Sequence, residues 1–259
     1  MALPETSIKA RVRAAAAAGL QPTVSIVIPA FNEATRIGDS VRKIDEFLER
    51  KPFSAEVIIV DDGSMDATAS VVSSAKSPNL RLIRNGRNLG KGYSVRQGVM
   101  QADGRYVLFT DADLSAPIDE LKKLLDLAMS EDADIVIGSR AVDRRYIGKR
   151  QSRFREIGGI AFNQVVRLLL GLNIHDTQCG FKLFHRERTK FLFEKQTTQG
   201  YGFDPELLFL ATRYGLKIKE VPVKWNHSEG SKVNPVRDGL KMLFDLVRIR
   251  WNYTFGKYS

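Results

Sequence analysis

Two short apolar runs, residues 57–60 and 106–109, each lead into a cluster of aspartates. Asp-Asp-Gly-Ser follows the first run at 61–64, and Asp-Ala-Asp follows the second at 111–113. An aspartate side chain is short, so a carboxylate at a strand end is held firmly over the adjoining crevice. Mg²⁺ and Mn²⁺ prefer oxygen ligands and commonly use one or two carboxylates together with substrate phosphates. The pattern predicts a divalent metal that neutralises a departing nucleoside diphosphate.

The same aspartates have a plainer interpretation as turn and helix-cap residues, which favour these residue types. Either cluster alone fits that interpretation better, and we interpret Asp66 and Asp119 in this way. Two clusters at successive strand ends of one sheet instead favour a functional site, because the carboxyl ends of parallel strands share one edge.

A glycine-rich segment at 85–92 reads Asn-Gly-Arg-Asn-Leu-Gly-Lys-Gly. Glycines with Arg87 and Lys91 at the start of a helix could bind phosphate. The segment is one residue short of a Walker loop, and Gly92 stands where Ser or Thr is needed. No GxGxxG follows the first predicted strand. These departures argue against a P-loop NTPase and against a dinucleotide dehydrogenase.

Short Val- and Ile-rich runs alternate with amphipathic ones along the chain, which predicts an α/β fold with a mostly parallel sheet flanked by helices. The predicted strands are residues 24–28, 57–60, 80–83, 106–109, 135–137, 181–184 and 218–223. The predicted helices are residues 35–50, 67–75, 92–101, 118–129, 157–172, 205–214 and 236–253, the last of them amphipathic.

The charge is unevenly distributed: residues 1–139 carry 17 Lys and Arg against 19 Asp and Glu, and residues 140–259 carry 23 against 11. The excess of positive charge in the second half suggests an anionic partner there, such as a phosphate, a membrane surface or a nucleic acid. The basic residues are neither interleaved with exposed aromatics nor part of a known nucleic-acid motif, and the strand-end aspartates would repel a polyanion. We therefore expect no nucleic-acid partner.

In combination these segments resemble glycosyltransferase family 2, whose members have the GT-A (Rossmann-like) fold. The matching segments are residues 24–33, 60–68, 88–92, 111–113 and 138–140. In the second half, residues 176–184, 203–208 and 229–233 are similar to the dolichyl-phosphate β-glucosyltransferases within the polyprenyl-phosphate glycosyltransferases. The resemblance implies an N-terminal extension at 1–22 and a single GT-A catalytic domain at 23–259. Residues 23–140 would hold the nucleotide sugar, and residues 141–259 would face the acceptor and the membrane.

The resemblance also implies the roles of individual residues. Asp113 and Asp111 would hold Mg²⁺ or Mn²⁺, although Ser115 stands where some relatives place a metal-binding Gln. Asp113, Arg140 and Asp204 would be catalytic. The nucleotide sugar would contact Pro29, Ala30, Glu33, Asp61, Asp62, Lys91, Asp111, Ala112 and Asp113. Acceptor phosphate and diphosphate would contact Arg140, Lys149, Arg150, Arg153, Ser231 and Lys232.

The implied reaction is the inverting transfer of glucose from a UDP-sugar donor, UDP-glucose, to a polyprenyl (dolichyl) phosphate, which gives a β-linked lipid. The alternatives are a GDP-mannose-dependent polyprenyl-phosphate mannosyltransferase and a family 2 transferase that acts on a glycan. The phosphate acceptor is already an anion, so it needs positioning rather than a strong base. On this view Asp204 contacts a sugar hydroxyl or an arginine, whereas a glycan acceptor would require it as a base.

The single cysteine, Cys179, excludes an internal disulfide and fits a reducing compartment. We expect it to be a small buried hydrophobe rather than a nucleophile. No segment reaches the roughly 18 apolar residues of a membrane span, and no secretory signal is evident. The expectation is therefore a cytoplasmic protein that associates peripherally with a membrane. Segments 157–172 and 236–253 have apolar faces with basic flanks, which suit a membrane interface or the protein's own core.

Overall fold

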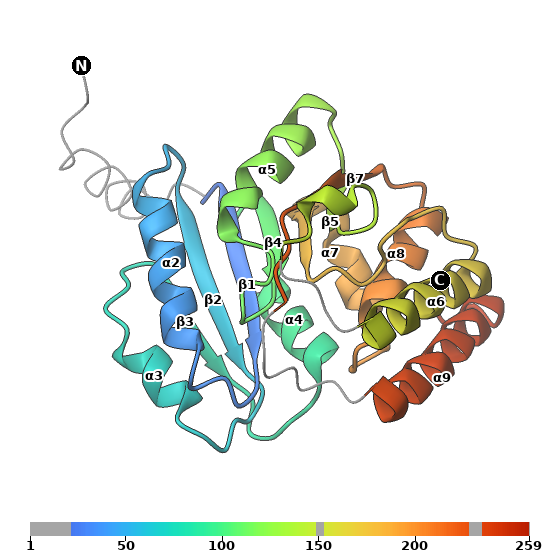
Figure 1. The fold of residues 1–259 in the computed structure, drawn as a ribbon, viewed down its shortest axis with the longest axis horizontal. Coiled ribbons are helices and arrows are strands. Elements are labelled where there is room, and N and C mark those ends of the chain that lie inside the picture. Colours follow the sequence, from blue (N-terminus) through green and yellow to red (C-terminus); the bar gives the residue numbers. More distant parts are fainter. Residues whose placement is uncertain (1–21, 149–152, 228–234, 259) are drawn as a thin grey trace.

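A computed structural model describes residues 22–148, 153–227 and 235–258 of the chain (Figure 1). The described residues form a seven-stranded sheet in the order β3-β2-β1-β4-β6-β5-β7. Its strands are β1 (Val24–Ala30), β2 (Ala55–Asp61), β3 (Leu80–Arg84), β4 (Tyr106–Thr110), β5 (Ile135–Ser139), β6 (Phe181–His185) and β7 (Ile218–Pro222). Only β6 runs antiparallel to its neighbours, β4 and β5. The predicted α/β fold with a mostly parallel sheet is confirmed.

The central strands are apolar because both of their faces are covered. All seven residues of β1 are buried. Ile26 and Ile28 point into one hydrophobic core, and Val27 points into the core on the opposite face. This period-two alternation gives the sheet two separate cores and holds the strand ends rigidly.

Helices cover both faces of the sheet (Figure 1). Residues of α2 (Ile37–Glu49), α3 (Thr68–Ser74) and α5 (Leu121–Ser130) pack into one core. The other core takes residues from α4 (Lys91–Met100), α6 (Arg153–Leu170), α7 (Arg186–Lys195), α8 (Phe203–Arg213) and α9 (Pro235–Thr254). The described connections include two 3₁₀ turns, η1 (Ile118–Glu120) and η2 (Arg144–Tyr146).

Two elements differ from the expectation. The predicted helix at 118–129 begins as the 3₁₀ turn η1 after Pro117 and becomes α-helical only at Leu121. Helix α7 was not predicted, because Arg186–Lys195 has four Lys and Arg among its ten residues and a weak apolar periodicity. It forms because Leu192 and Phe193 are buried in the second core, with the Phe193 ring 5.1 Å from that of Phe184. Tertiary packing here outweighs local pattern.

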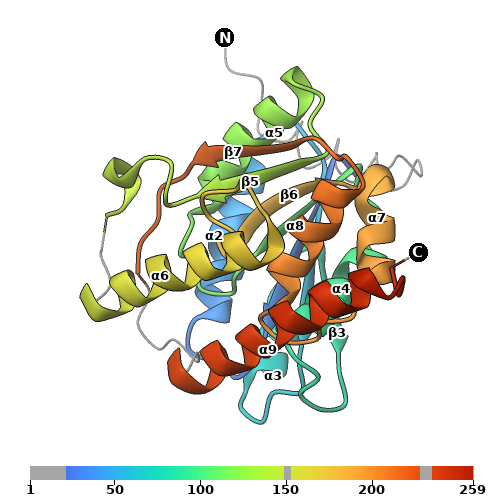
Figure 2. The same cartoon turned by 90° about the vertical axis from the view of Figure 1, so that its right-hand side faces the viewer.

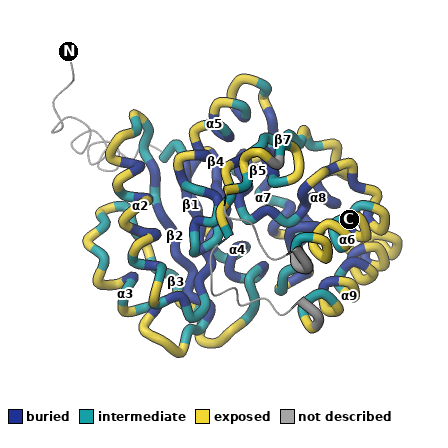
Figure 3. The backbone as a smooth tube through the Cα atoms, in the orientation of Figure 1, coloured by how far each residue is buried: buried dark blue, intermediate teal, exposed yellow. Residues whose placement is uncertain are grey.

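Helix α8 lies deep in the molecule, with every residue from Phe203 to Ala211 buried. Helices α6 and α9 pack against it and against each other on the outside. Figure 3 shows the burial of α8 and the extensive exposure of α6 and α9. The second half of the chain therefore adds an outer helical layer beside the sheet.

Within the described ranges, every helix is too short or too polar to cross a membrane.

Candidate functional site

A cleft of about 1750 Å³ lies at the carboxyl ends of β1, β2, β4 and β5. Parallel strands bring their carboxyl ends to one edge, so segments far apart in the chain meet there. Ten residues predicted for the site line this cleft: Pro29, Ala30, Glu33, Asp62, Lys91, Asp111, Ala112, Asp113, Arg140 and Asp204.

The Asp62 carboxylate organises the glycine-rich segment before α4. Its Oδ1 accepts hydrogen bonds from Leu89 N (2.9 Å) and Asn85 Nδ2 (2.8 Å), and its Oδ2 accepts one from Gly90 N (2.8 Å). Gly90 has a φ of +105°, which an L side chain rarely adopts. These contacts fix the start of α4 and so position Lys91, its first residue.

Lys91 pairs with the first aspartate of the Asp-Ala-Asp segment. Its Nζ lies 2.7 Å from Asp111 Oδ1. Burial alone would lower the pKa of Lys91, but the negative charges of Asp111 and Asp204 outweigh it and raise the pKa. The ammonium group therefore stays charged in the cleft, where an anionic ligand can compete for it.

Asp111 rests directly on Gly180, the residue before β6. Its amide donates to Gly180 O at 3.2 Å, and a Cβ at Gly180 would lie 2.0 Å from Asp111 Oδ2. Only a glycine leaves room for the carboxylate in this position.

We expect Gly180→Ala to reduce catalytic turnover at least about tenfold, because it displaces Asp111, and tenfold corresponds to only 1.4 kcal/mol in the barrier. The matched control is Gly86→Ala, since a Cβ there meets nothing within 4 Å. Turnover and thermal unfolding are measured for both variants. Equal turnover in Gly180→Ala and the wild type would show that the position of Asp111 is unimportant.

Asp113, at the same turn, is held by a different set of contacts. Its Oδ1 accepts a hydrogen bond from Ser115 N (3.0 Å), and Oδ2 lies 3.8 Å from Arg36 Nη1. Arg36 is itself paired with Glu33 in the loop that follows β1. Leu114, between Asp113 and Ser115, has a φ of +47°, a strained value for a leucine. Such strain is typical of functional turns, since packing must hold it in place.

Arg140 forms the wall of the cleft after β5. Its Nε and Nη2 donate to Asp176 Oδ2 (2.7 Å) and Oδ1 (2.8 Å), and its amide donates to the same carboxylate at 2.9 Å. Its guanidinium lies 5.6 Å from the ring centroid of Trp225. Burial alone would raise the pKa of Asp176, but the charge and hydrogen bonds of Arg140 lower it to about 2. The guanidinium is thus fixed in one orientation.

Asp204, at the start of α8, pairs with a buried lysine. Lys182 Nζ lies 2.7 Å from Asp204 Oδ1 and donates to Cys179 O at 2.6 Å. Burial raises the pKa of Asp204, and the charges of Lys182 and Lys91 offset only part of this effect. The sequence suggested an arginine or a sugar hydroxyl as the partner of Asp204, and the charged partner found is a lysine of β6.

Replacing Lys182 by methionine is expected to lower the free energy of unfolding by about 3–5 kcal/mol, because it leaves a buried carboxylate without its cation. Urea unfolding measures the loss, and Lys182→Met combined with Asp204→Asn should recover part of it. The control is Lys122→Met, which breaks the exposed pair with Asp126. A Lys182→Met protein as stable as that control would contradict the buried ion pair.

The carboxylates of the cleft suit a hard divalent cation that takes its remaining ligands from a bound molecule and water. The described residues contain no group of three or more His, Cys, Asp and Glu side chains placed to hold a metal by themselves. Asp111 and Asp113 offer two carboxylates at one turn of the cleft. Mg²⁺ and Mn²⁺ are commonly held by one or two carboxylates with the remaining ligands from water and phosphate.

The other predicted site residues lie elsewhere. Asp61 is buried beneath the cleft and does not line it; its Oδ1 accepts a hydrogen bond from Ser64 N at 3.0 Å. Lys149, Arg150, Ser231 and Lys232 lie outside the described residues, and Arg153 begins α6 with a side chain that is not described.

The sequence reasoning assigned no role to three residues that line the cleft, Arg36, Asp176 and Trp225, or to the buried Lys182, which pairs with Asp204. Asp176 and Lys182 lie within the 176–184 segment that carried the resemblance. The presence of an acidic and a basic residue in one motif could therefore have indicated that both have a role. Arg36 and Trp225 had no such signal. Cys179 is buried as expected, and burial raises the pKa of its thiol to about 12, so the thiol stays protonated at neutral pH.

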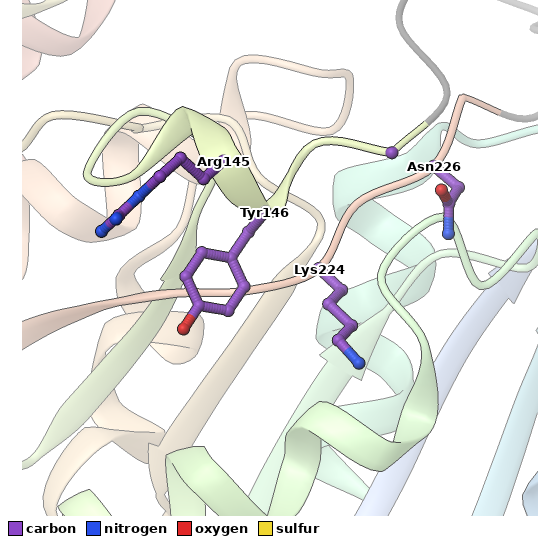
Figure 4. Close-up of a pocket in the computed structure, with 5 residues that line it drawn as sticks. Arg145, Tyr146, Lys224 and Asn226 are labelled. Carbon is purple, nitrogen blue, oxygen red and sulfur yellow. The ribbon is translucent and has the colours of Figure 1, made fainter.

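Figure 4 shows the residues around a smaller hollow of about 570 Å³. A bridge joins Ile147 to Trp225, and both line the cleft together with His227. Residues that lie close to these in the chain line the hollow instead: Arg145, Tyr146, Gly148, Lys224 and Asn226. Along 224–226 the side chains alternate as in an extended segment, so Trp225 faces the cleft while Lys224 and Asn226 face the hollow.

Comparison with known proteins gives one family. The glycosyl transferase family 2 domain matches residues 25–193. A dolichyl-phosphate beta-glucosyltransferase of Dictyostelium discoideum is 37% identical over 247 residues, which cover 90% of this chain and 75% of that protein. The enzymes of the same name from Saccharomyces cerevisiae (36% identical; 91% and 76% covered) and Homo sapiens (35%; 91% and 77%) are similarly related.

Solved structures with low sequence identity share the fold. Mannosyl-3-phosphoglycerate synthase from Rubrobacter xylanophilus superposes with a TM-score of 0.68 at 20% identity, over 95% of this chain and 78% of that one. Glucosyl-3-phosphoglycerate synthase from Mycobacterium tuberculosis, solved with Mn²⁺ and UDP-glucose, gives 0.63 at 20% identity, over 95% and 84%. At this identity the likeness concerns the fold alone.

Proposed function

Because the chain belongs to glycosyl transferase family 2, and the fold is of the GT-A type, we propose that it transfers glucose from UDP-glucose to a polyprenyl (dolichyl) phosphate. The observation that carries the proposal is the convergence of Asp111, Asp113, Lys91 and Arg140 on one cleft at the strand ends. Relatives at 35–37% identity over most of the chain are named for dolichyl-phosphate glucosyl transfer.

The transfer is a single displacement. A phosphate oxygen of the lipid attacks the anomeric carbon, the bond from that carbon to UDP breaks, and the electron pair leaves with UDP. Attack from the face opposite UDP inverts the configuration and gives the β-linked lipid phosphate sugar. The nucleophile is already an anion, so the protein contributes mainly positioning and charge neutralisation.

The residues of the cleft suit that task. Lys91 presents a charged ammonium beside Asp111. A diphosphate that enters the cleft can replace Asp111 as the partner of this ammonium. Arg140 is a second cation, clamped by Asp176, where two anionic substrates must be brought together. Asp111 and Asp113 would hold a divalent cation, which would supply positive charge to neutralise the leaving group.

Asp204 serves better as a binding residue than as a base. Its carboxylate is 2.7 Å from Lys182 Nζ and lines the cleft, where it can accept a hydrogen bond from a sugar hydroxyl. An acceptor that already carries a negative charge needs no proton removed. Asp204→Asn should therefore weaken the affinity for the sugar and leave the shape of the pH profile of turnover unchanged.

The test is transfer from radiolabelled UDP-glucose to a polyprenyl phosphate in detergent with Mn²⁺, in parallel with GDP-mannose. Labelled lipid from UDP-glucose supports donor and acceptor together. Transfer from GDP-mannose alone would keep the displacement and overturn the sugar. Binding of UDP-glucose with metal but no labelled lipid would overturn the acceptor and favour a glycan.

We also propose that the protein works at the cytoplasmic face of a membrane. Support comes from its single buried cysteine, which suits a reducing compartment, and from the proposed acceptor, which is a lipid.

A further inference from the structure

The outward side of α6 carries no charge along most of its length. Every exposed residue between positions 157 and 170 is uncharged. Its exposed large side chains are Ile157, Ile160, Val165, Leu168 and Leu169, with Leu168 81% exposed. The helix buries Val166 and Leu170 on the side that faces the core. The exposed side chains of Ile157 and Leu168 lie on the opposite side of the helix, so they do not belong to that core.

Helix α9 shows the same arrangement. Its inner side buries Leu246 and Ile249. A second apolar stripe lies on its outward side at spacings of about one helical turn. This stripe consists of Leu240, Phe244, Val247 and Trp251 and continues to Phe255 just beyond the helix, and each is more than half exposed. A helix in contact with water alone would place polar residues there, so this stripe is unexplained by folding.

The two stripes belong to one surface, which we call the α6–α9 face. Helix α6 packs against α9, and Figure 2 looks onto both helices lying side by side at the front of the molecule. The face consists of Ile157, Ile160, Val165, Leu168, Leu240, Phe244, Val247, Trp251 and Phe255. Contiguous exposed apolar surface of this kind marks an interaction site rather than ordinary solvent-exposed protein.

The α6–α9 face continues into the functional cleft. Ile160 and Phe162 of α6, and Phe244 of α9, line that cleft together with Asp111 and Arg140. One apolar surface therefore connects the outside of the molecule with the charged groups of the site. An amphiphile with a phosphate head and a long apolar tail fits this continuity.

Basic side chains border the face. Arg237, Lys241 and Arg248 recur along one flank of the α9 stripe, and Arg250 lies on the other flank. Trp251 and Phe255 lie at the C-terminal end, with ring centroids 4.4 Å apart. Apolar and aromatic side chains flanked by Lys and Arg are typical of helices that lie in the interface of an anionic membrane.

We propose that the α6–α9 face docks on the surface of a bilayer that contains anionic lipids, with the mouth of the cleft turned toward the headgroups. A second copy of the chain would cover the apolar stripes but would bring the two basic flanks together. The bilayer instead offers negative charge to these flanks and apolar chains to the stripes. The docking surface is inferred from its own residues; it rests on the proposed function only in that a lipid acceptor would explain why the protein binds a membrane.

The test is co-sedimentation of the full chain with vesicles of phosphatidylcholine alone or with 30% phosphatidylglycerol. The variant Leu168→Ser/Trp251→Ser places one change on each helix, at residues outside the cleft. We expect binding to mixed vesicles to fall at least tenfold in the variant and to weaken in 0.5 M salt. Met129→Ser, an exposed apolar residue of α5, should bind like the wild type.

Two outcomes would overturn the proposal: equal vesicle binding by the wild type and the double variant, or no binding by either. A concentration-dependent dimer, measured by analytical ultracentrifugation and abolished in the double variant, would assign the face to a second copy. Circular dichroism checks that the double variant is folded. Vesicle binding needs no donor or acceptor, so its result stands apart from the transfer assay, in which failure would concern the proposed function alone.

Discussion

Asp113→Ala should reduce sugar transfer by at least about 100-fold while the protein stays folded, the scale expected when a charge-stabilising group is removed from a transition state. The Asp113 carboxylate is partly exposed in the cleft and is held by Ser115 N at 3.0 Å, so its orientation is fixed before any ligand arrives. Its loss removes one of two carboxylates available to a divalent cation at that turn. The measurement is turnover with labelled donor across a range of Mn²⁺ concentrations.

The matched control is Asp119→Ala, which removes an exposed carboxylate from η1, 3.8 Å from Arg50 and outside the cleft. We expect it to keep wild-type turnover and the same dependence on Mn²⁺. If Asp113→Ala kept full turnover with an unchanged Mn²⁺ dependence, the proposed metal role of this turn would be wrong. A large increase in the Mn²⁺ concentration needed for half-maximal turnover would instead support it.

The second large effect is expected at Asp176, where substitution should damage both stability and turnover. Asp176→Asn keeps the size of the side chain but removes the charge that Arg140 faces through two hydrogen bonds and a backbone amide. Breaking such a pair costs about 3–5 kcal/mol when both partners are buried, and Arg140 is partly exposed, so we expect about 2–4 kcal/mol. The released guanidinium should also lower turnover at least about tenfold, since it can no longer be held for phosphate.

The pH dependence has a definite sign. The folded-state pKa of Asp176 is about 2, below the ordinary value of 3.8, because Arg140 stabilises the carboxylate against the opposing effect of burial. The wild type therefore gains stability from this group above about pH 4 and loses it as the pH falls toward 2. The gain amounts to about 2 kcal/mol. Urea unfolding between pH 2.5 and 6 should show this loss in the wild type and little of it in Asp176→Asn.

Asp143→Asn provides the control for the Asp176 experiment, because Asp143 also pairs with an arginine, the highly exposed Arg145. Water screens that pair, so its removal should leave stability within the error of the measurement. An equal loss of stability in Asp176→Asn and Asp143→Asn would mean that burial of the Arg140–Asp176 pair adds nothing to its contribution to stability.

The strands were the most predictable part of the fold. Runs such as Val57–Val60 are apolar on both faces, because helices cover both sides of the sheet, and their composition alone identifies them. The direction of β6 was beyond the sequence. The run Phe181–Phe184 looks the same in either orientation, and its antiparallel placement between β4 and β5 is set by contacts with distant strands.

The site was predictable where a strand end fixed it and unpredictable where a pair formed across the fold. Asp111 and Asp113 follow a recognisable strand, so their convergence with Glu33 and Lys91 could be inferred from topology. Pairs such as Arg140 with Asp176 bring together residues whose distance in the chain carries no signal. Asp61 shows the limit of this reasoning: Asp61 and Asp62 are adjacent and both buried, but only Asp62 lines the cleft.

The position of β6 has a consequence for how the protein acquires its activity during synthesis. Strands β3, β2, β1 and β4 are neighbours in the sheet, so they can pair once residue 110 has emerged. Strand β5 must wait, because its neighbours β6 and β7 both come later in the chain. The Gly180 carbonyl that holds Asp111 arrives with β6. Pairing between distant segments is slow, so we expect a nascent chain with half its sheet formed and Asp111 still without its final support.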